Sequence, residues 1–303
     1  MPHYRTDRSV SIQSILYGTD PGAVERTLEA FDTAAAWGAG DGLGPVSVTL
    51  GDASPERVLT DAHLAAMRGR FTALAAIDYQ FFGENTGTAK GHNRLAAGGA
   101  SQFIVTSNPD IVPDRRALAR MVALFDDPVN GMVEAKQSPI EHPKEYDTET
   151  GETGWAATAF AMTPRVLFEE LGGFDEQTFF MYCDDVDYSW LVRESGHRVV
   201  FQPAAVVFHD KRLSADGAWQ PTSAERFYSA QAALLLAHKW SRDDVVAQVA
   251  ATFEGSRVAE LVDAASEFRR RTETGMLVTQ RDEEHVVAEF HDNGYYTAHR
   301  YGL

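Results

Sequence analysis

The segment CDDVD is the first candidate for chemistry, because Asp184, Asp185 and Asp187 place three carboxylates within four residues. An apolar run precedes the segment, and a stretch with Tyr188 and Leu191 on one side follows it. This pattern predicts that the acids lie in the first turn of a helix, where the helix dipole favours ionised carboxylates. A helix cap needs one aspartate, whereas three crowded carboxylates repel one another unless a cation or ligand compensates. Because an ionised carboxylate can act as a general base, we interpret this segment as a reactive site.

Two further residues could bind a divalent cation. Asp110 ends the sequence Asn108-Pro109-Asp110 after an apolar run, where a carboxylate could ligate a hard cation or simply cap a helix beyond Pro113. Taken alone, this sequence favours the cap. His209 ends the run AAVVFH, and neutral imidazole is a common metal ligand. A histidine at the end of a strand is often only a polar terminus, so spacing alone does not decide the role of His209.

The first 110 residues alternate strands and helices, which could bring such side chains together. Strands are expected at 9–17, 46–50, within 71–82 and at 102–106, with helices beginning at Pro21, at Pro55 and after a loop at 85–91. This βαβ spacing predicts an α/β fold with a mostly parallel, Rossmann-like sheet. Ligands bind beyond the carboxyl ends of the strands in such sheets. Gly18, Asp52, Asn85 and Asp110 all follow expected strands, so we expect them at one edge.

The second half has a less regular pattern. Strands are expected at 132–138, 155–163, 199–201 and 205–208, a helix at 164–171, and a largely helical region from 213 to about 271. Near the end, HVVAEF and YYTAHRY flank Asn293-Gly294, which predicts a β-hairpin. We therefore expect a helical C-terminal extension that ends in a hairpin.

Composition excludes several classes of partner. Asp and Glu outnumber Lys and Arg by 44 to 27, giving a net charge of −17, which disfavours nucleic acids and anionic membrane surfaces. No uninterrupted apolar run approaches about 18 residues, so we expect no membrane-spanning segment. The one cysteine, Cys183, excludes an internal disulfide framework and fits a reducing compartment. These features predict a cytoplasmic protein.

The segment from Leu171 to His209, LGGFDEQTFFMYCDDVDYSWLVRESGHRVVFQPAAVVFH, resembles the inverting glycosyltransferases of family 2, which have the GT-A fold. That family has the pattern GGFDE, FF, Y, EDVD, an arginine-bearing helix, a Gly and Arg-Val turn, a proline and a closing histidine. The NPD sequence and the GxxxGxN-like segment 87–93 also fall where the family places them. The resemblance covers residues 10–212 and extends to rhamnosyltransferase-like and galactofuranosyltransferase-like subgroups.

The resemblance implies a nucleotide-binding role for five residues. Asp52 would contact the base, and Tyr17 would line the base pocket. Asn85, Gly91 and Asn93 would help to hold the nucleoside and the pyrophosphate. A UDP sugar or a dTDP sugar would be the donor, since a base-binding aspartate recognises the edge that the two pyrimidines share.

The resemblance also implies the residues for metal binding and catalysis. Asp110 would be the metal ligand of the DxD motif, Asn108 would occupy its first position, and His209 would be a second ligand. Asp185 would be the catalytic base, and Asp184 would position hydroxyl groups. The cofactor would be Mg²⁺ or Mn²⁺, because a site this acidic would otherwise repel a pyrophosphate. The chain also lacks the GxxxxGK[ST] loop that binds phosphates through backbone amides.

The implied organisation is a GT-A domain at 1–212 and a mostly helical extension at 213–303. Residues 1–110 would be the half that binds the nucleotide sugar, and residues 111–212 the acceptor and catalytic half. The acceptor would be a hydroxyl of a saccharide, a lipid-linked saccharide or a small molecule. The extension could shape acceptor binding, form a homodimer interface or serve only for packing.

The chain departs from the family pattern in four places: Asn108 replaces an aspartate, Asp184 a glutamate, Thr158 a common glycine, and the segment Tyr17-Gly18-Thr19 the usual Tyr-Asn. Two other functions therefore stay open. A sugar nucleotidyltransferase would need a Gly- and Arg-rich loop after the first strand, and YGTDPGAVER fits that poorly. A non-catalytic protein that binds nucleotide sugars is the other alternative.

Overall fold

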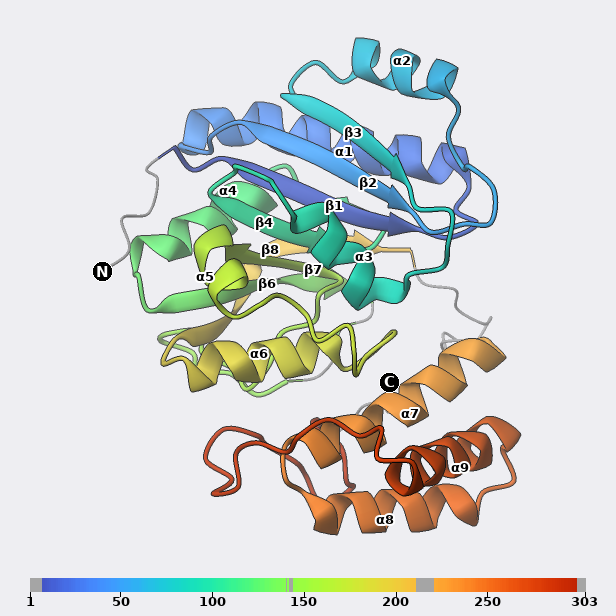
Figure 1. Ribbon diagram of the computed structural model, residues 1–303. Helices are drawn as coiled ribbons and strands as arrows, with labels where there is room; N and C mark the ends of the chain where they lie inside the picture. The colour runs from blue at the N-terminus through green and yellow to red at the C-terminus, as the bar shows by residue number, and fades with distance from the viewer. Residues whose placement is uncertain (1–6, 140, 142–143, 211–220, 299–303) are drawn as a thin grey trace.

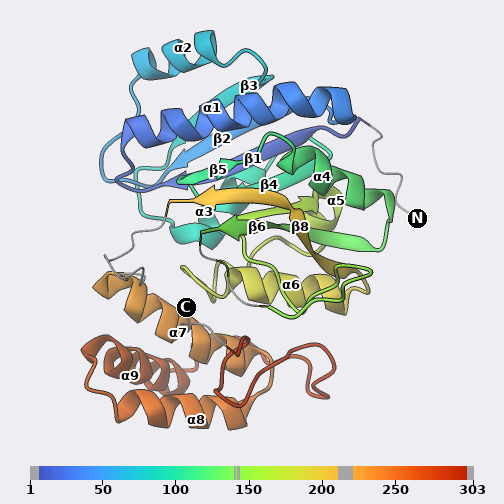
Figure 2. The same cartoon turned by 180° about the vertical axis from the view of Figure 1, so that it is seen from behind.

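The computed structural model describes residues 7–139, 141, 144–210 and 221–298, which contain one eight-stranded sheet with helices on both faces (Figures 1 and 2). The strands are β1 (Val10–Leu16), β2 (Val46–Asp52), β3 (Ala76–Phe81), β4 (Phe103–Ser107), β5 (Ile111–Pro113), β6 (Asn130–Ser138), β7 (Phe160–Pro164) and β8 (Arg198–His209). Their order is β3-β2-β1-β4-β7-β6-β8-β5. Four neighbouring pairs are parallel and three, β4–β7, β6–β7 and β5–β8, are antiparallel. The predicted α/β fold with a mostly parallel sheet is confirmed.

Helices cover both faces of the sheet, and a further group of helices packs on the outer side of one of these two layers. The helices are α1 (Pro21–Gly38), α2 (Asp61–Arg70), α3 (Gly87–Ala96), α4 (Ala117–Ala123), α5 (Arg165–Glu170), α6 (Asp184–Glu194), α7 (Ser223–Lys239), α8 (Asp243–Glu254) and α9 (Ala259–Glu273). In Figure 2, α1 and α4 lie in front of one face, and in Figure 1, α3, α5 and α6 lie in front of the other. Helices α7, α8 and α9 pack on the outer side of α6. Each interface has a buried apolar core, which supplies the main driving force for folding.

Local signals fix α1 as the sequence predicts. Asp20 caps the helix by accepting a hydrogen bond from the backbone N–H of Ala23 at 2.9 Å, and Pro21 occupies the first turn. Leu28 and Phe31 point from α1 into the core and are fully buried. The helix therefore packs along the strands whose carboxyl ends carry the candidate residues.

Several elements differ from the sequence-based expectation, and one is the strand expected at 155–163, which is shorter because β7 begins at Phe160. Helix α2 begins at Asp61 and not at Pro55, because Thr60 caps it and the preceding residues form a turn around Asp52. Residues 87–96 form α3, so Gly91 and Asn93 lie on a helix that we expected to begin later. The two short strands expected around Pro203 are one strand, β8, which continues through a register shift between Ala135 and Lys136 of β6.

The predicted C-terminal hairpin is wrong for the described residues, since 281–298 contain no strand. The Asn293 side chain instead donates hydrogen bonds to the carbonyls of Thr297 and Ala298, which curls the chain after the turn. Tyr296 then packs edge-on against Trp155 at a ring distance of 4.8 Å. Residues 299–301 of the expected second strand lie outside the described residues. No helix among the described residues is both long and apolar enough to span a bilayer.

Candidate active site

Strand pairing brings Asp110 and His209 together. Ile111 of β5 pairs with His209 of β8 in antiparallel register, and the carbonyl of Asp110 accepts a hydrogen bond from the N–H of Asp210 at 3.1 Å. As a result, Oδ1 of Asp110 lies 3.4 Å from Nε2 of His209. The side-chain amide nitrogen of Asn108 lies 3.3 Å from the same Nε2. The side chains of Asn108 and Asp110 thus both meet Nε2 of His209. The sequence singled out all three residues, although Asn108 and His209 are 101 positions apart in the chain.

A contact from β6 orients the ring of His209. Its Nδ1 lies 2.7 Å from Oε1 of the buried Gln137, an oxygen that accepts a hydrogen bond when the neutral ring carries its proton on Nδ1. The other nitrogen, Nε2, then carries a lone pair that faces Asp110 and Asn108. Metal-binding histidines commonly have this arrangement, in which a hydrogen bond to one nitrogen orients the other as the ligand.

The donor set fits a divalent cation whose remaining ligands come from elsewhere. Within the described residues, no group of three or more His, Cys, Asp or Glu side chains could hold a metal ion. Asp110 and His209 could offer one oxygen and one nitrogen ligand, and the Asp110 side chain is 38 % exposed toward solvent. A cation held by these two residues would keep open positions for an oxygen-rich ligand, as catalytic metal sites do.

Asp52 is at the expected strand end, but its carboxylate is already bonded within the chain. It is fully buried, accepts hydrogen bonds from the N–H groups of Ser54 and Val58 at 3.0 and 2.7 Å, and also accepts one from the Tyr79 hydroxyl. Burial would raise the pKa of Asp52, but these hydrogen bonds outweigh it and lower the pKa. The carboxylate thus holds the turn at 53–58. A contact between Asp52 and the base of a nucleotide would have to be made alongside these hydrogen bonds.

The other residues expected around the nucleotide fall into two groups. Tyr17 and Asn85 are exposed after β1 and before α3, and Tyr17 is 57 % exposed. Gly91 is buried in α3, where a Cβ atom would come within 2.8 Å of the Ile15 side chain on β1. Gly91 therefore lets α3 approach the sheet closely, which is a packing role.

The structure assigns Asn93 to a different task. Its side-chain nitrogen donates to the Phe174 carbonyl at 2.8 Å and to the Glu176 carboxylate at 2.9 Å, and its oxygen accepts from the Phe174 N–H at 2.9 Å. The amide is thereby committed to the GGFDE segment, 81 residues away in the chain. Both N–H groups of the amide are used, so the predicted nucleotide contact of Asn93 could be made only through the second lone pair of its oxygen.

The acids of α6 divide into different environments. Asp184 is buried and accepts a hydrogen bond from the Thr88 hydroxyl of α3 at 2.8 Å. Asp185 is half-buried, and its Oδ1 accepts from the N–H of Val186 at 2.9 Å. Both views place this end of α6, α3 and the carboxyl end of β8 at the same end of the molecule (Figures 1 and 2). Of these acids, Asp185 is the more open to a ligand.

The environment of Asp184 predicts a pH dependence of stability. Burial and repulsion from Asp185 raise the pKa of Asp184 from 3.8 to about 7. Because the raised pKa favours the protonated form in the folded state, its stabilising effect is full below about pH 4 and is lost as the pH rises toward 7. We expect Asp184→Asn to increase the free energy of unfolding relative to the native protein at about pH 8 but not at about pH 4.

Urea denaturation of both proteins across this range measures the difference. Glu134 is also buried, and its pKa is also raised to about 7, but it is present in both proteins and cancels in the comparison. Parallel stability profiles for Asp184→Asn and the native chain would show that Asp184 is already ionised at neutral pH in the folded state.

Asp187, the third acid, is not directed at a ligand. It is fully buried, and it accepts a hydrogen bond from the Lys239 ammonium at 2.8 Å and one from the Trp240 indole N–H at 2.9 Å. Lys239 also donates to Asp175 at 2.8 Å. Sequence reasoning missed Lys239 and Trp240, although a charged residue that ends the apolar run AALLLAHKW was a signal of a buried partner.

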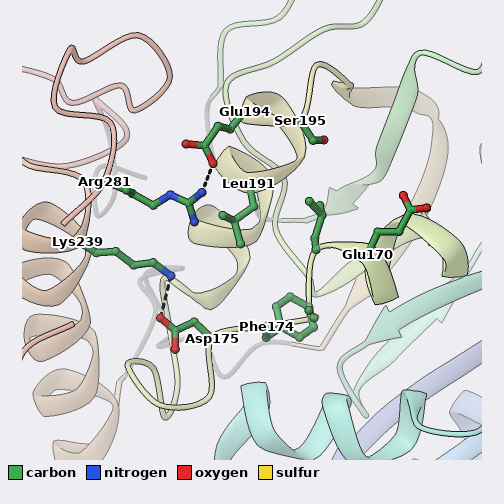
Figure 3. A pocket seen from close by; sticks show the side chains of 11 residues that line it. Glu170, Phe174, Asp175, Leu191, Glu194, Ser195, Lys239 and Arg281 are labelled. Atoms are coloured by element: carbon green, nitrogen blue, oxygen red, sulfur yellow. Dashed lines mark hydrogen bonds and ion pairs between the residues drawn. The ribbon is translucent and has the colours of Figure 1, made fainter. Parts of the chain in front are cut away.

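A cavity of about 390 Å³ lies next to this network, between α5, α6 and the C-terminal helices. Figure 3 shows Lys239 and Arg281 reaching into it from the C-terminal side, opposite Asp175 and Glu194. The residues that line it include none of the residues predicted to bind the nucleotide or the metal. The cavity is therefore separate from the candidate metal site.

Comparisons with known proteins agree with this architecture. No family model matches the chain. N-acetylglucosaminyl-diphospho-decaprenol L-rhamnosyltransferase of Mycobacterium tuberculosis is 38% identical over 61 residues, which are 20% of this chain and 20% of that enzyme. The curated relative is thus matched over only a fifth of its length.

Solved structures match over most of the chain. They include a mannosyltransferase from Pyrobaculum calidifontis in complex with GDP-Man and Mn²⁺ (TM-score 0.55, 18% identity, 88% of this chain and 75% of that one). GalNAc-T7 with UDP, GalNAc and Mn²⁺ has a TM-score of 0.62 at 12% identity, over 88% and 57% of the two chains. S. aureus TarS has a TM-score of 0.53 at 13% identity, over 87% and 43%. The chain has the GT-A fold of these glycosyltransferases, which confirms the predicted fold class.

Proposed function

We propose that this protein is a glycosyltransferase that moves a glycosyl group, with inversion, from a nucleoside-diphosphate sugar to a hydroxyl acceptor. The observation that carries the proposal is the meeting of Asp110 and His209 at the edge of a glycosyltransferase-type sheet, with His209 oriented by Gln137. The fold supports a nucleotide-sugar donor, since two of the similar structures were determined with GDP-Man or with UDP. For this chain we propose a UDP or dTDP sugar, with Tyr17, Asp52 and Asn85 near the nucleoside.

Asp110 and His209 are the residues that would hold Mg²⁺ or Mn²⁺, and Asn108 would adjoin them. A divalent cation at this place neutralises negative charge on a diphosphate leaving group when bound. Two of the similar structures contain Mn²⁺, which supports a metal-dependent reaction. The high negative charge of the chain adds to the case, because carboxylates alone would repel the donor.

Asp185 is the proposed general base. Its carboxylate takes the proton of the acceptor hydroxyl as that oxygen forms a bond to the anomeric carbon, and the bond from that carbon to the diphosphate breaks. One displacement from the opposite face inverts the anomeric configuration. Asp184 is bonded to Thr88, so in this proposal it fixes the first turn of α6 beside α3 and does not itself touch the acceptor.

The contact between Gln137 and His209 gives a test of the metal site. We expect Gln137→Leu to weaken Mn²⁺ binding by about 10–100-fold, because the outer partner of a metal-binding histidine sets its orientation and basicity. Leucine has a similar size and also removes the buried side-chain nitrogen of Gln137, which has no hydrogen-bond partner among the described residues. Calorimetric titration with Mn²⁺ in the presence of UDP measures the change. An unaltered affinity would contradict the assigned role of His209.

The function itself is tested by a thermal-shift screen of nucleoside-diphosphate sugars with and without Mn²⁺, followed by assays with the donor that binds. Release of a nucleoside diphosphate that depends on a saccharide, lipid-linked saccharide or small-molecule acceptor supports the proposal. Release of pyrophosphate from a nucleoside triphosphate and a sugar phosphate would support a nucleotidyltransferase. Donor binding without transfer to any acceptor tested would favour a non-catalytic binding protein.

A further inference from the structure

Lys239 is a buried cation that joins two separate parts of the catalytic half. Its ammonium donates to the carboxylates of Asp175 and Asp187 at 2.8 Å each, and its side chain is 6 % exposed. The next residue, Trp240, donates its indole N–H to the other oxygen of Asp187 at 2.9 Å. Figure 3 shows Lys239 extending from the C-terminal helices to Asp175. One end of α7 therefore reaches both the GGFDE segment and the first turn of α6.

The two carboxylates bound by Lys239 flank the segment 176–186, which carries Asp184 and Asp185. Within it, Tyr182 and Cys183 have left-handed backbone conformations, with φ of 66° and 57°. Residues other than glycine adopt this conformation at a cost in free energy, and it persists only where the surroundings hold it. Immediately afterwards α6 begins, with the N–H of Asp187 bonded to the carbonyl of Cys183 at 2.9 Å.

The same helix supports this segment at a second point. The ring of Tyr228, near the start of α7, lies 4.7 Å from the ring of Phe180. On the opposite side, the Phe180 carbonyl accepts a hydrogen bond from the N–H of Thr88 at 2.9 Å. The segment 176–186 is therefore held between α3 of the sheet domain and α7 of the C-terminal helices.

We propose that Lys239, assisted by Trp240, is a positioning residue for the reaction. By bridging Asp175 and Asp187 it fixes the segment 176–186 and, through that segment, the carboxylate of Asp185. The C-terminal helices are then part of the catalytic unit and more than a packing extension. This inference rests on the proposed glycosyltransferase function, because it assigns Lys239 a role in that reaction.

The charges explain why a cation is needed at this place. Without Lys239, Asp175 and the fully buried Asp187 would face each other with no positive charge between them. Two buried carboxylates in that arrangement repel, and removing one member of a buried ion pair leaves an uncompensated charge. The chain would relieve this repulsion by shifting the segment 176–186 that joins the two carboxylates. That shift would move the carboxylate of Asp185 away from the position it needs for catalysis.

Chemical rescue of Lys239→Ala tests the proposal. Lys239 lines the cavity of about 390 Å³, so shortening it creates a space through which a small alkylammonium ion can reach Asp175 and Asp187 (Figure 3). We expect kcat to fall by about 100-fold, as follows from misplacing a catalytic group by about 1 Å, with little change in the KM of the donor. Ethylammonium should restore part of kcat, and ethanol, which is of similar size but uncharged, should not.

Hydrogen exchange of the backbone supplies a readout that does not depend on activity. In Lys239→Ala, exchange at 180–186 should become faster while α8 and α9 stay protected, and ethylammonium should slow it again. Glu170→Gln is the matched control, because Glu170 of α5 lines the same cavity on the side away from Lys239 (Figure 3). This control should retain the native kcat and the native exchange at 180–186.

The outcomes separate this proposal from the proposed function. If the native protein transfers sugar and Lys239→Ala does so equally well, the positioning role is wrong. If the native protein transfers no sugar, the proposed function fails. Unchanged hydrogen exchange at 180–186 in Lys239→Ala would in addition overturn the bridging role. If Lys239→Ala does not fold, Trp240→Phe takes its place, because it keeps the aromatic packing and removes one hydrogen bond to Asp187. Unchanged kcat and unchanged exchange at 180–186 in Trp240→Phe would overturn the proposal.

Discussion

Asp185→Asn is expected to lower kcat by about 10²–10⁴-fold, which is the usual contribution of a general base. The substitution keeps the size of the side chain and the oxygen that accepts from the N–H of Val186, so the first turn of α6 should be retained. The lost property is the ability to take a proton from the acceptor hydroxyl. Initial rates of nucleoside diphosphate release, together with the Kd of the donor from calorimetry, separate catalysis from binding, and the Kd should stay near the native value.

The matched control for Asp185→Asn lies on the same helix. Glu194→Gln removes a carboxylate at the other end of α6, where Glu194 is paired with Arg281 and lies outside the proposed metal and donor sites. Its kcat should equal that of the native protein. Native kcat in Asp185→Asn would remove Asp185 as the base, and equal losses in both variants would indicate a general effect on α6.

Local sequence signals predicted the elements that carry the site. Asp20 and Pro21 start α1 through contacts made within three residues. The apolar runs of β1, β2 and β4 are each followed or ended by polar residues at the edge of the sheet where the candidate site lies. Such features depend on neighbours in the chain, so a single sequence contains most of the information. The α/β class and the edge at which the candidate site lies were therefore predictable.

The roles of single polar side chains were harder to predict, because they depend on distant partners. Asn93 was expected at the nucleotide, but it bonds to Phe174 and Glu176, more than 80 residues away. The three acids of the CDDVD segment look equivalent in the sequence, yet Asp187 is bound by Lys239, 52 residues later. A motif indicates which residues matter together, and only packing decides which of them face a ligand.

The candidate metal site is intermediate between these cases. The residues alone leave the roles of Asp110 and His209 open, and only the resemblance joins them at one metal. The short strand β5, which nothing in the sequence predicts, places them side by side. Gln137 was not suspected, since an amide on a buried strand has no sequence signature. Its contact orients the ring of His209, and this supports the metal assignment by an observation that is independent of the resemblance.

His209→Ala should therefore abolish the metal-dependent part of donor binding. In the native protein, Mn²⁺ together with UDP at about 100 times Kd should stabilise the fold by about 2.7 kcal/mol, seen as a rise in Tm. With His209 removed, the one nitrogen ligand of the proposed pair is missing, and the added Mn²⁺ should give no further rise beyond that caused by UDP alone. Transfer should fall by about 10³-fold, which corresponds to losing several kcal/mol of leaving-group stabilisation.

Two controls make this result specific to the site. His291→Ala removes an exposed histidine whose hydrogen bonds involve its backbone, so its response to Mn²⁺ and UDP should be native. Chelation by EDTA should bring the native protein to the level of His209→Ala and should leave that variant unchanged, because both treatments remove the same cation. Full transfer by the native protein in EDTA would instead mean that Asp110 and His209 serve the fold, with the diphosphate stabilised by other groups.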